Sequence, residues 1–245
     1  MNHSLQKRLV AETLGTAFLL AAVVGSGIMG ERLAGDNVAI VLLANTIATG
    51  AALVALILTF GPISGAHFNP VVTLADASQQ GIAWREAPLY IAAQIVGGFA
   101  GVASANLMFG LPMFFSSHHA RAGVPQLFSE FIATFGLLTV IWGCVRQRSA
   151  TVPFAAAAYI IAAYWFTAST SFANPAVTLA RSASDTFAGI RPVDTPGFIV
   201  AQLLGGATAT ALFRWLVPLQ REDTEAVVLP HGGEVHSDEC TSGGR

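Results

Sequence analysis

The sequence predicts an all-α membrane protein with six transmembrane helices and two re-entrant half-helices. Three observations predict this fold class: an apolar composition, six long apolar segments, and an internal duplication in which each copy contains one Asn-Pro pair. The 245 residues are 53% hydrophobic and only 11% charged. A soluble domain of this size does not bury so large an apolar fraction, so a lipid bilayer is the expected environment.

The six expected spans follow from length, because a transmembrane helix needs roughly 20 mainly apolar residues. The segments that reach this length lie near residues 10–30, 38–60, 87–110, 126–146, 152–171 and 195–217. The first is longer than the apolar region of an export signal and is repeated later in the chain, so we expect a span that is not removed. Six crossings place both termini on one side.

Basic residues near the span ends indicate the orientation. Those on the side of the termini are Lys7, Arg8, Arg85, Arg146, Arg148, Arg214 and Arg221, and those on the other side are Arg32, Arg121, Arg181 and Arg191. Basic residues are enriched in cytoplasmic loops, which favours cytoplasmic termini and a multi-pass protein of the cell (inner) membrane. The chain has no basic patch of the kind that binds nucleic acid.

The duplication is clearest around the two Asn-Pro pairs. Residues 69–75 (Asn-Pro-Val-Val-Thr-Leu-Ala) recur as residues 174–180 (Asn-Pro-Ala-Val-Thr-Leu-Ala), and Tyr90–Gly98 resembles Phe198–Gly206. Glu12 with Thr16 likewise corresponds to Glu130 with Thr134. The expected organisation is a first repeat over 1–110, a connecting loop over 111–125, a second repeat over 126–218 and a disordered cytoplasmic tail over 219–245.

Three spans per repeat force the second copy into the membrane upside down, an arrangement that places the functional site at the bilayer midplane. Asn is a preferred N-cap and Pro suits the first helical position, so each pair predicts a helix start. The apolar stretch that follows is only about ten residues, or roughly 15 Å of helix, which reaches half-way through the bilayer. We expect half-helices over 69–77 and 174–183 whose starts meet at the centre.

Small residues spaced by four follow each box. They are Ala93, Gly97 and Gly101 in the third span, and Ala201, Gly205 and Ala209 in the sixth. Such spacing predicts close helix packing in lipid.

Residues 64–70 (Ser-Gly-Ala-His-Phe-Asn-Pro) and the second Asn174-Pro175-Ala176 resemble the two signature boxes of the major intrinsic proteins. The resemblance covers residues 5–218 and implies an aquaporin-like channel with one pore per subunit in a homotetramer. The expected pore centre is Asn69, Pro70 and Val71 with Asn174, Pro175 and Ala176. Val71 departs from the usual alanine and is expected to add apolar bulk there.

The half-helix starts predict how the pore centre acts on solutes. Each helix N-terminus contributes about half a positive elementary charge, which hinders cations and protons but not neutral dipoles. The two asparagine amides can donate hydrogen bonds to a passing oxygen. Glu12 and Glu130 are carboxylates inside spans, a default signal of function, and the resemblance implies that they brace the re-entrant loops. It also implies that His67 lies at the cytoplasmic pore entrance.

The resemblance further implies a selectivity filter of four positions, which fall on Thr49, Ala162, Ser171 and Val177 by counting from the boxes. Val177 stands where the family usually has arginine, so we expect a wide, uncharged filter. Such a filter suits glycerol, urea, water and neutral metalloid hydroxides such as arsenite, with methylated arsenicals as further cargo. In lacking this arginine, the sequence resembles the bacterial aquaglyceroporins associated with arsenic resistance.

Two charges occupy matching half-helix ends, and their roles stay open. Arg181 suits a helix C-terminus, whereas Asp76 opposes the helix dipole. We expect Asp76 to reach water or pair with Arg85, or alternatively to shape the cytoplasmic pore mouth. In the tail, His231, His236 and Cys240 can bind a soft metal, but a solvated tail is the preferred interpretation.

Competing functions are a secondary transporter and a water-selective aquaporin. A transporter uses similar inverted repeats but needs a coupling residue in the membrane, and the spans offer only the two glutamates assigned to bracing. No nucleophile, base and orienting group converge, so an enzyme is not expected. Cys144 and Cys240 do not suggest a disulfide framework. We expect no metal site and no cofactor.

Overall fold

The computed structural model describes residues 3–217, except for the side chains of residues 147 and 148. In this part of the chain every regular element is helical. The six long helices are α1 (Leu5–Ala34), α2 (Val38–Ser64), α4 (Ala87–Met108), α5 (Val124–Arg148), α6 (Val152–Phe166) and α8 (Thr195–Leu216). Two short helices, α3 (Pro70–Ser78) and α7 (Pro175–Arg181), follow the Asn-Pro boxes.

These six helices are long and apolar enough to cross a membrane, which agrees with the all-α membrane fold expected from the sequence. Short 3-10 turns at Ser149–Thr151 and Pro192–Asp194 lead into α6 and α8. The expected tail over 219–245 lies outside the described residues.

Helix α1 extends beyond its expected span at both ends, whereas α6 is shorter than expected and ends at Phe166 rather than near residue 171. The next residues remain small and weakly polar, so hydropathy does not mark the end of the helix. The backbone marks it instead, because Thr170, Ser171 and Ala173 have φ between 49° and 60°. Non-glycine residues seldom adopt this left-handed region. The segment therefore turns back toward the centre as a loop.

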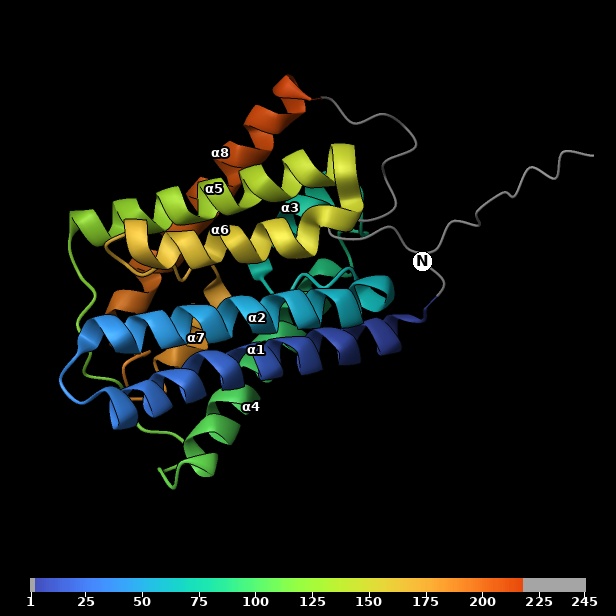
Figure 1. Cartoon of the computed structure of the whole chain (residues 1–245). Coiled ribbons are helices and arrows are strands. Elements are labelled where there is room, and N and C mark those ends of the chain that lie inside the picture. The colour runs from blue at the N-terminus through green and yellow to red at the C-terminus, as the bar shows by residue number, and fades with distance from the viewer. Residues whose placement is uncertain (1–2, 218–245) are drawn as a thin grey trace, which may run out of the picture.

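Helix pairs from the two repeats pack in the same way: α1 lies against α2 and α4, and α5 lies against α6 and α8. A Cβ atom on Gly97 of α4 would lie 2.3 Å from the carbonyl oxygen of Thr13 in α1, and one on Gly205 of α8 would lie 2.4 Å from that of Phe131 in α5. Glycine thus permits a backbone contact that any side chain would block. In Figure 1, α3 lies at the level of α5 and α6 and α7 at the level of α1 and α2, and both short helices contact α4 and α8.

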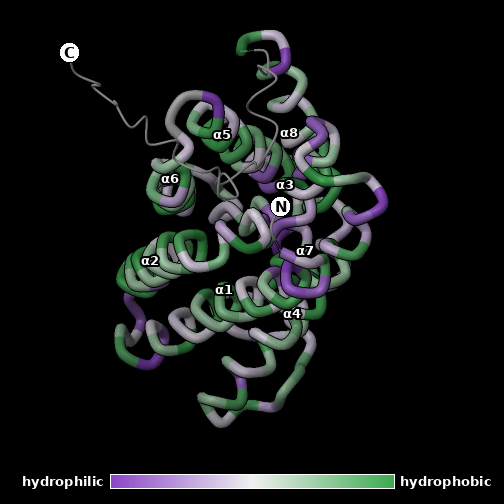
Figure 2. The backbone as a smooth tube through the Cα atoms, turned by 90° about the vertical axis from the view of Figure 1, so that its right-hand side faces the viewer, coloured by the Kyte–Doolittle hydropathy of each residue, from purple (hydrophilic) through white to green (hydrophobic). Residues whose placement is uncertain are grey.

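The outer surface of the bundle is apolar. Large exposed side chains include Val10, Phe18, Ile47, Phe128 and Val200. Hydrophobic residues dominate the long helices along their length in Figure 2. Exposed apolar area on this scale is rare in soluble monomers and matches contact with lipid, so the chain is a multi-pass membrane protein.

Candidate functional site

The two asparagines start the half-helices by capping them. The side-chain oxygen of Asn69 accepts a hydrogen bond from the backbone N–H of Val71 at 2.9 Å. The oxygen of Asn174 accepts from Ala176 at 3.0 Å and from Val177 at 3.2 Å. In both cases the next residue is proline, whose missing N–H needs no partner at the first helical position. The Asn-Pro pairs thus place two helix N-termini inside the bundle.

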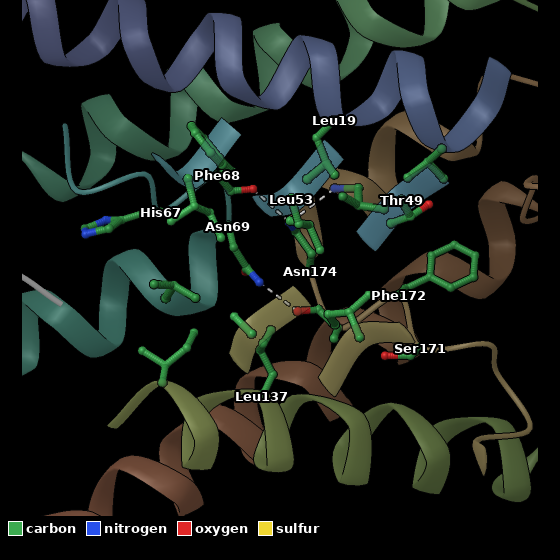
Figure 3. A pocket seen from close by; sticks show the side chains of 18 of the residues that line it. Leu19, Thr49, Leu53, His67, Phe68, Asn69, Leu137, Ser171, Phe172 and Asn174 are labelled. Carbon is green, nitrogen blue, oxygen red and sulfur yellow. Dashed lines mark hydrogen bonds between the residues drawn. The ribbon is translucent and has the colours of Figure 1, made fainter. Parts of the chain in front are cut away.

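Each asparagine also donates a hydrogen bond to the opposite repeat, as the dashed lines of Figure 3 show. Asn69 Nδ2 lies 2.8 Å from the carbonyl oxygen of Ala173, and Asn174 Nδ2 lies 2.7 Å from that of Phe68. These bonds join the two re-entrant loops. An amide carries two N–H donors, so each asparagine retains one for another acceptor.

The loop before α3 is held by Glu12 of α1. Its carboxylate accepts backbone hydrogen bonds from His67 at 3.0 Å and Phe68 at 2.8 Å. It also accepts from the side chains of Ser64 at 2.6 Å and Gln94 at 2.8 Å. The Glu12 side chain is fully buried. Four donors therefore surround a carboxylate that would otherwise be costly in an apolar interior.

Glu130 of α5 holds the loop before α7 in the same way. It accepts from the backbone of Phe172 and Ala173, both at 2.9 Å, and from Gln202 at 2.6 Å. Gln202 also donates to Thr178 at 2.9 Å, just as Gln94 donates to Thr73 at 2.8 Å. The duplicated sequence thus folds into a duplicated Glu-Gln-Thr bracket, one for each half-helix.

A cavity of about 80 Å³ passes the half-helix junction. Its wall includes Leu19, Val23, Leu53, Ile57, Val72, Leu137, Ile141, Val152, Ala156 and Ile160. Polar atoms reach it from Asn69 and Asn174 at the junction, from His67 on one side, and from Thr49 and Ser171 on the other (Figure 3). The arrangement is an apolar passage with a short polar track.

Three of the four expected filter residues line this cavity: Thr49, Ser171 and Val177. Ala162 does not, because its side chain is exposed on the outer face of α6. Ile160 and Tyr164 line the cavity from α6 instead. Two residues along a helix correspond to roughly 200° of rotation, so Ala162 faces away from the side on which both of these residues lie. Tyr164 therefore takes the place in the wall that counting assigned to Ala162.

Other members of the expected pore centre lie behind the cavity. Pro70, Val71, Pro175 and Ala176 are buried and are not among the lining residues. The Val71 side chain packs against α8, where its Cγ1 lies 2.1 Å from the position that a Cβ on Gly206 would take. The extra bulk at this position is therefore accommodated by a glycine of α8 and does not fill the pore.

The first of the two alternatives for Asp76 is wrong, because it neither reaches water nor pairs with Arg85. It is buried, and its Oδ2 lies 3.4 Å from Nε2 of His67. The other ring nitrogen of His67 lies 3.1 Å from the hydroxyl of Thr73. Arg85 is exposed. The histidine at this mouth is thus fixed by two residues of α3, which could not be read from the spacing of the charges.

The expected absence of charge near Val177 is wrong, because Arg181, whose role the sequence left open, also lines the cavity. Its guanidinium carbon lies 3.4 Å from the ring centroid of Phe172. Arg181 follows Val177 by four residues and therefore shares its face of α7. That spacing is a signal from which this placement could have been expected.

A second arginine near the same ring has a different role. Arg121 lies in the loop before α5 with its guanidinium carbon 4.9 Å from the Phe172 centroid. It donates to the carbonyl oxygens of Gly189 at 2.8 Å, Ser169 at 3.1 Å and Phe187 at 3.3 Å. Burial lowers the pKa of Arg121 to about 10, so the group remains charged at pH 7. Its donors join three loop segments around this mouth.

No three His, Cys, Asp or Glu side chains of residues 3–217 gather in an arrangement suited to a metal ion. The chemistry of the described site consists of hydrogen bonding, helix dipoles and one cation.

Comparisons with known proteins identify the family. The profile described as "Major intrinsic protein" matches residues 1–166. Aquaglyceroporin AqpS of Rhizobium meliloti (strain 1021) is 54% identical over 213 residues, which are 87% of this chain and 91% of that protein. Aquaporin NIP1-3 of Oryza sativa subsp. japonica is 36% identical over 146 residues, covering 59% and 50% of the two chains.

Among solved structures, the X-ray structure of the aquaglyceroporin from Plasmodium falciparum matches with a TM-score of 0.69 at 19% identity, covering 88% of this chain and 98% of that one. This likeness shows the same fold. Because the family profile spans most of the chain and the half-helices meet as a duplicated pair inside six spans, the chain belongs to the major intrinsic protein family.

Proposed function

We propose that this chain is a passive channel that conducts glycerol, urea, water and neutral metalloid hydroxides such as arsenite, with methylated arsenicals as further cargo. Membership of the family supports the broader statement, a channel for small neutral solutes rather than an enzyme. The observation that carries the proposal is the cavity lining, which combines aliphatic walls with the amides of Asn69 and Asn174 and includes no carboxylate.

Three of the side chains at the filter support solutes larger than water, while Tyr164 and Arg181 line its remaining sides. Thr49, Ser171 and Val177 are small or medium-sized, and the position directly after the second box holds valine in place of the usual arginine. Similarity to two proteins named aquaglyceroporins points the same way. Hydroxyl groups of a polyol or metalloid hydroxide can exchange hydrogen bonds with the asparagine amides and with Ser171 and Thr49.

Coupled transport is the main alternative. A proton-coupled transporter needs a titratable group that faces the solute and changes its accessibility. The buried carboxylates Glu12, Glu130 and Asp76 are all absent from the lining. The histidine that does line it, His67, is held in place by Asp76 and Thr73. The geometry therefore favours flux that follows the solute gradient alone.

We further propose that the channel assembles as a homotetramer in the cell (inner) membrane with both termini in the cytoplasm. The His67 mouth would then face the cytoplasm and the Arg181 mouth the outside. The distribution of basic residues supports this orientation.

Flux measurements on purified protein in proteoliposomes test the proposal. Glycerol and urea should enter faster than into protein-free liposomes, without saturation, and imposed pH or sodium gradients should not change the rates. Arsenite entry is measured by the arsenic content of the vesicles. Accumulation against a gradient would establish coupled transport, and water flux without glycerol or urea flux would establish a water-selective channel.

A further inference from the structure

The two repeats place different chemistry at equivalent positions of the pore. An offset of 105 residues relates Asn69 to Asn174, and the same offset relates His67 to Phe172 and Asp76 to Arg181. In each repeat the loop residue contacts its half-helix partner: His67 lies 3.4 Å from Asp76, and Phe172 lies 3.4 Å from the Arg181 guanidinium. One mouth thus holds an acid beside a histidine, and the other holds a cation on an aromatic ring.

Arg181 retains most of its hydrogen-bonding capacity. Its side chain is buried, and its one hydrogen bond within residues 3–217 runs from Nε to the carbonyl oxygen of Ala188. A guanidinium has five N–H donors, so the four on the terminal nitrogens have no protein acceptor in this part of the chain. None of the ion pairs in the described chain includes Arg181. Stacking on Phe172 compensates only part of the cost of burying this charge.

The neighbouring Arg121 shows that buried arginines at this mouth can direct their donors to protein acceptors. Its donors are directed to loop carbonyl oxygens, and it is not among the residues that line the cavity. Arg181, by contrast, lines the cavity together with Ser171, whose buried hydroxyl likewise has no hydrogen-bond partner. Unsatisfied donors and a hydroxyl that line the same passage indicate a site for a ligand with acceptor oxygens.

We propose that Arg181 supplies the filter cation that Val177 cannot supply, and that its terminal nitrogens bind acceptor oxygens of neutral solutes with two or more hydroxyl groups during passage. The inference rests on the proposed function. The planar fork of arginine can contact two oxygens of one solute at once, which water cannot match. The fixed positive charge repels inorganic cations at the same point.

The test compares Arg181→Met, Arg181→Lys and Arg32→Gln in proteoliposomes and planar bilayers. Methionine keeps an unbranched side chain on Phe172 but removes the charge and all donors, whereas lysine keeps the charge without the fork. Arg32 is exposed on the same side of the molecule and does not line the cavity, so Arg32→Gln controls for general surface charge. Elution volume and thermal unfolding establish that each variant is folded.

We expect Arg181→Met to raise sodium current at least tenfold and to lower the glycerol-to-water permeability ratio at least threefold. Arg181→Lys should keep sodium out but show the lower ratio, and Arg32→Gln should match the wild type. If Arg181→Met does not fold, Arg181→Gln takes its place with the same two measurements. A folded variant that keeps both the sodium exclusion and the permeability ratio of the wild type overturns the inference. Failure of the wild type itself to pass glycerol or urea overturns the proposed function instead.

Discussion

Replacing Glu12 or Glu130 by glutamine tests whether the buried carboxylates hold the re-entrant loops. Glutamine has nearly the same shape, but it replaces one acceptor oxygen by an NH₂ donor. The carboxylate of Glu12 accepts four hydrogen bonds and that of Glu130 accepts three. Gln94 and Gln202 can turn their amides to accept from the new NH₂. A backbone N–H of the loop cannot adjust in this way.

At least one loop N–H in each variant therefore faces another N–H. A buried donor without an acceptor costs about 1–3 kcal/mol. The remaining hydrogen bonds lose the assistance of the charge, which makes them about half as strong. Together these losses predict destabilisation of about 2–4 kcal/mol. The larger loss belongs to Glu12→Gln, because Glu12 has one partner more than Glu130.

Thermal unfolding of the detergent-solubilised protein measures the effect. For a chain of this size we expect a decrease in Tm of roughly 5–15 °C, with lower yields of folded protein. Glu31→Gln is the matched control, because Glu31 is exposed and accepts one hydrogen bond, from Phe187 at 3.2 Å. Its Tm should stay within about 2 °C of the wild type. If Glu12→Gln and Glu130→Gln have the same Tm as Glu31→Gln and conduct glycerol normally, the two carboxylates do not brace the loops.

Further substitutions test the filter and the helix packing. Val177→Arg adds four heavy atoms and a charge one helical turn from Arg181, beside a cavity of about 80 Å³. Glycerol and arsenite flux should therefore fall about tenfold or more, while water flux falls less. Thr49→Trp should add to this effect, and equal loss of all solutes in a folded variant would contradict it. Gly97→Ala brings a Cβ within 2.3 Å of the Thr13 carbonyl oxygen and should cost about 1–3 kcal/mol in thermal unfolding. Gly25→Ala is the control, because its Cβ would lie 3.5 Å from the nearest atom, and this variant should be neutral or stabilising. Equal Tm values for Gly97→Ala and Gly25→Ala would show that the α1–α4 contact tolerates an alanine side chain at residue 97.

Periodic and duplicated features of this protein could be predicted from the sequence. Span length and hydropathy locate the six long helices, because crossing a bilayer requires a long apolar segment. The Asn-Pro pairs predict where α3 and α7 begin, because capping and proline geometry depend only on neighbouring residues. Glu12 and Glu130 can also be recognised from the sequence, since a carboxylate inside an apolar span is costly and indicates a functional or structural partner.

Counting along the chain was less successful around the filter. The wall residue from α6 is Tyr164 and not Ala162, and α6 ends about five residues earlier than its apolar character suggests. The loop that follows α6 has positive φ values at Thr170 and Ser171, so residue spacing across it does not predict its path. Composition does not encode such backbone angles.

The membrane environment, the inverted duplication and the groups at the half-helix starts could all be inferred without a structure, since they depend on composition, length and local capping. The folded structure was needed to show that Tyr164 rather than Ala162 lines the passage, and which side chains the buried charges contact. Asp76 lies against His67 and not against Arg85, although the two are equally distant from it along the chain and Arg85 carries the opposite charge. Arg181 stacks on Phe172 within the cavity wall. These contacts join a re-entrant loop to the far end of its own half-helix. They depend on where the folded loop brings His67 and Phe172, which the spacing of the charged residues does not specify.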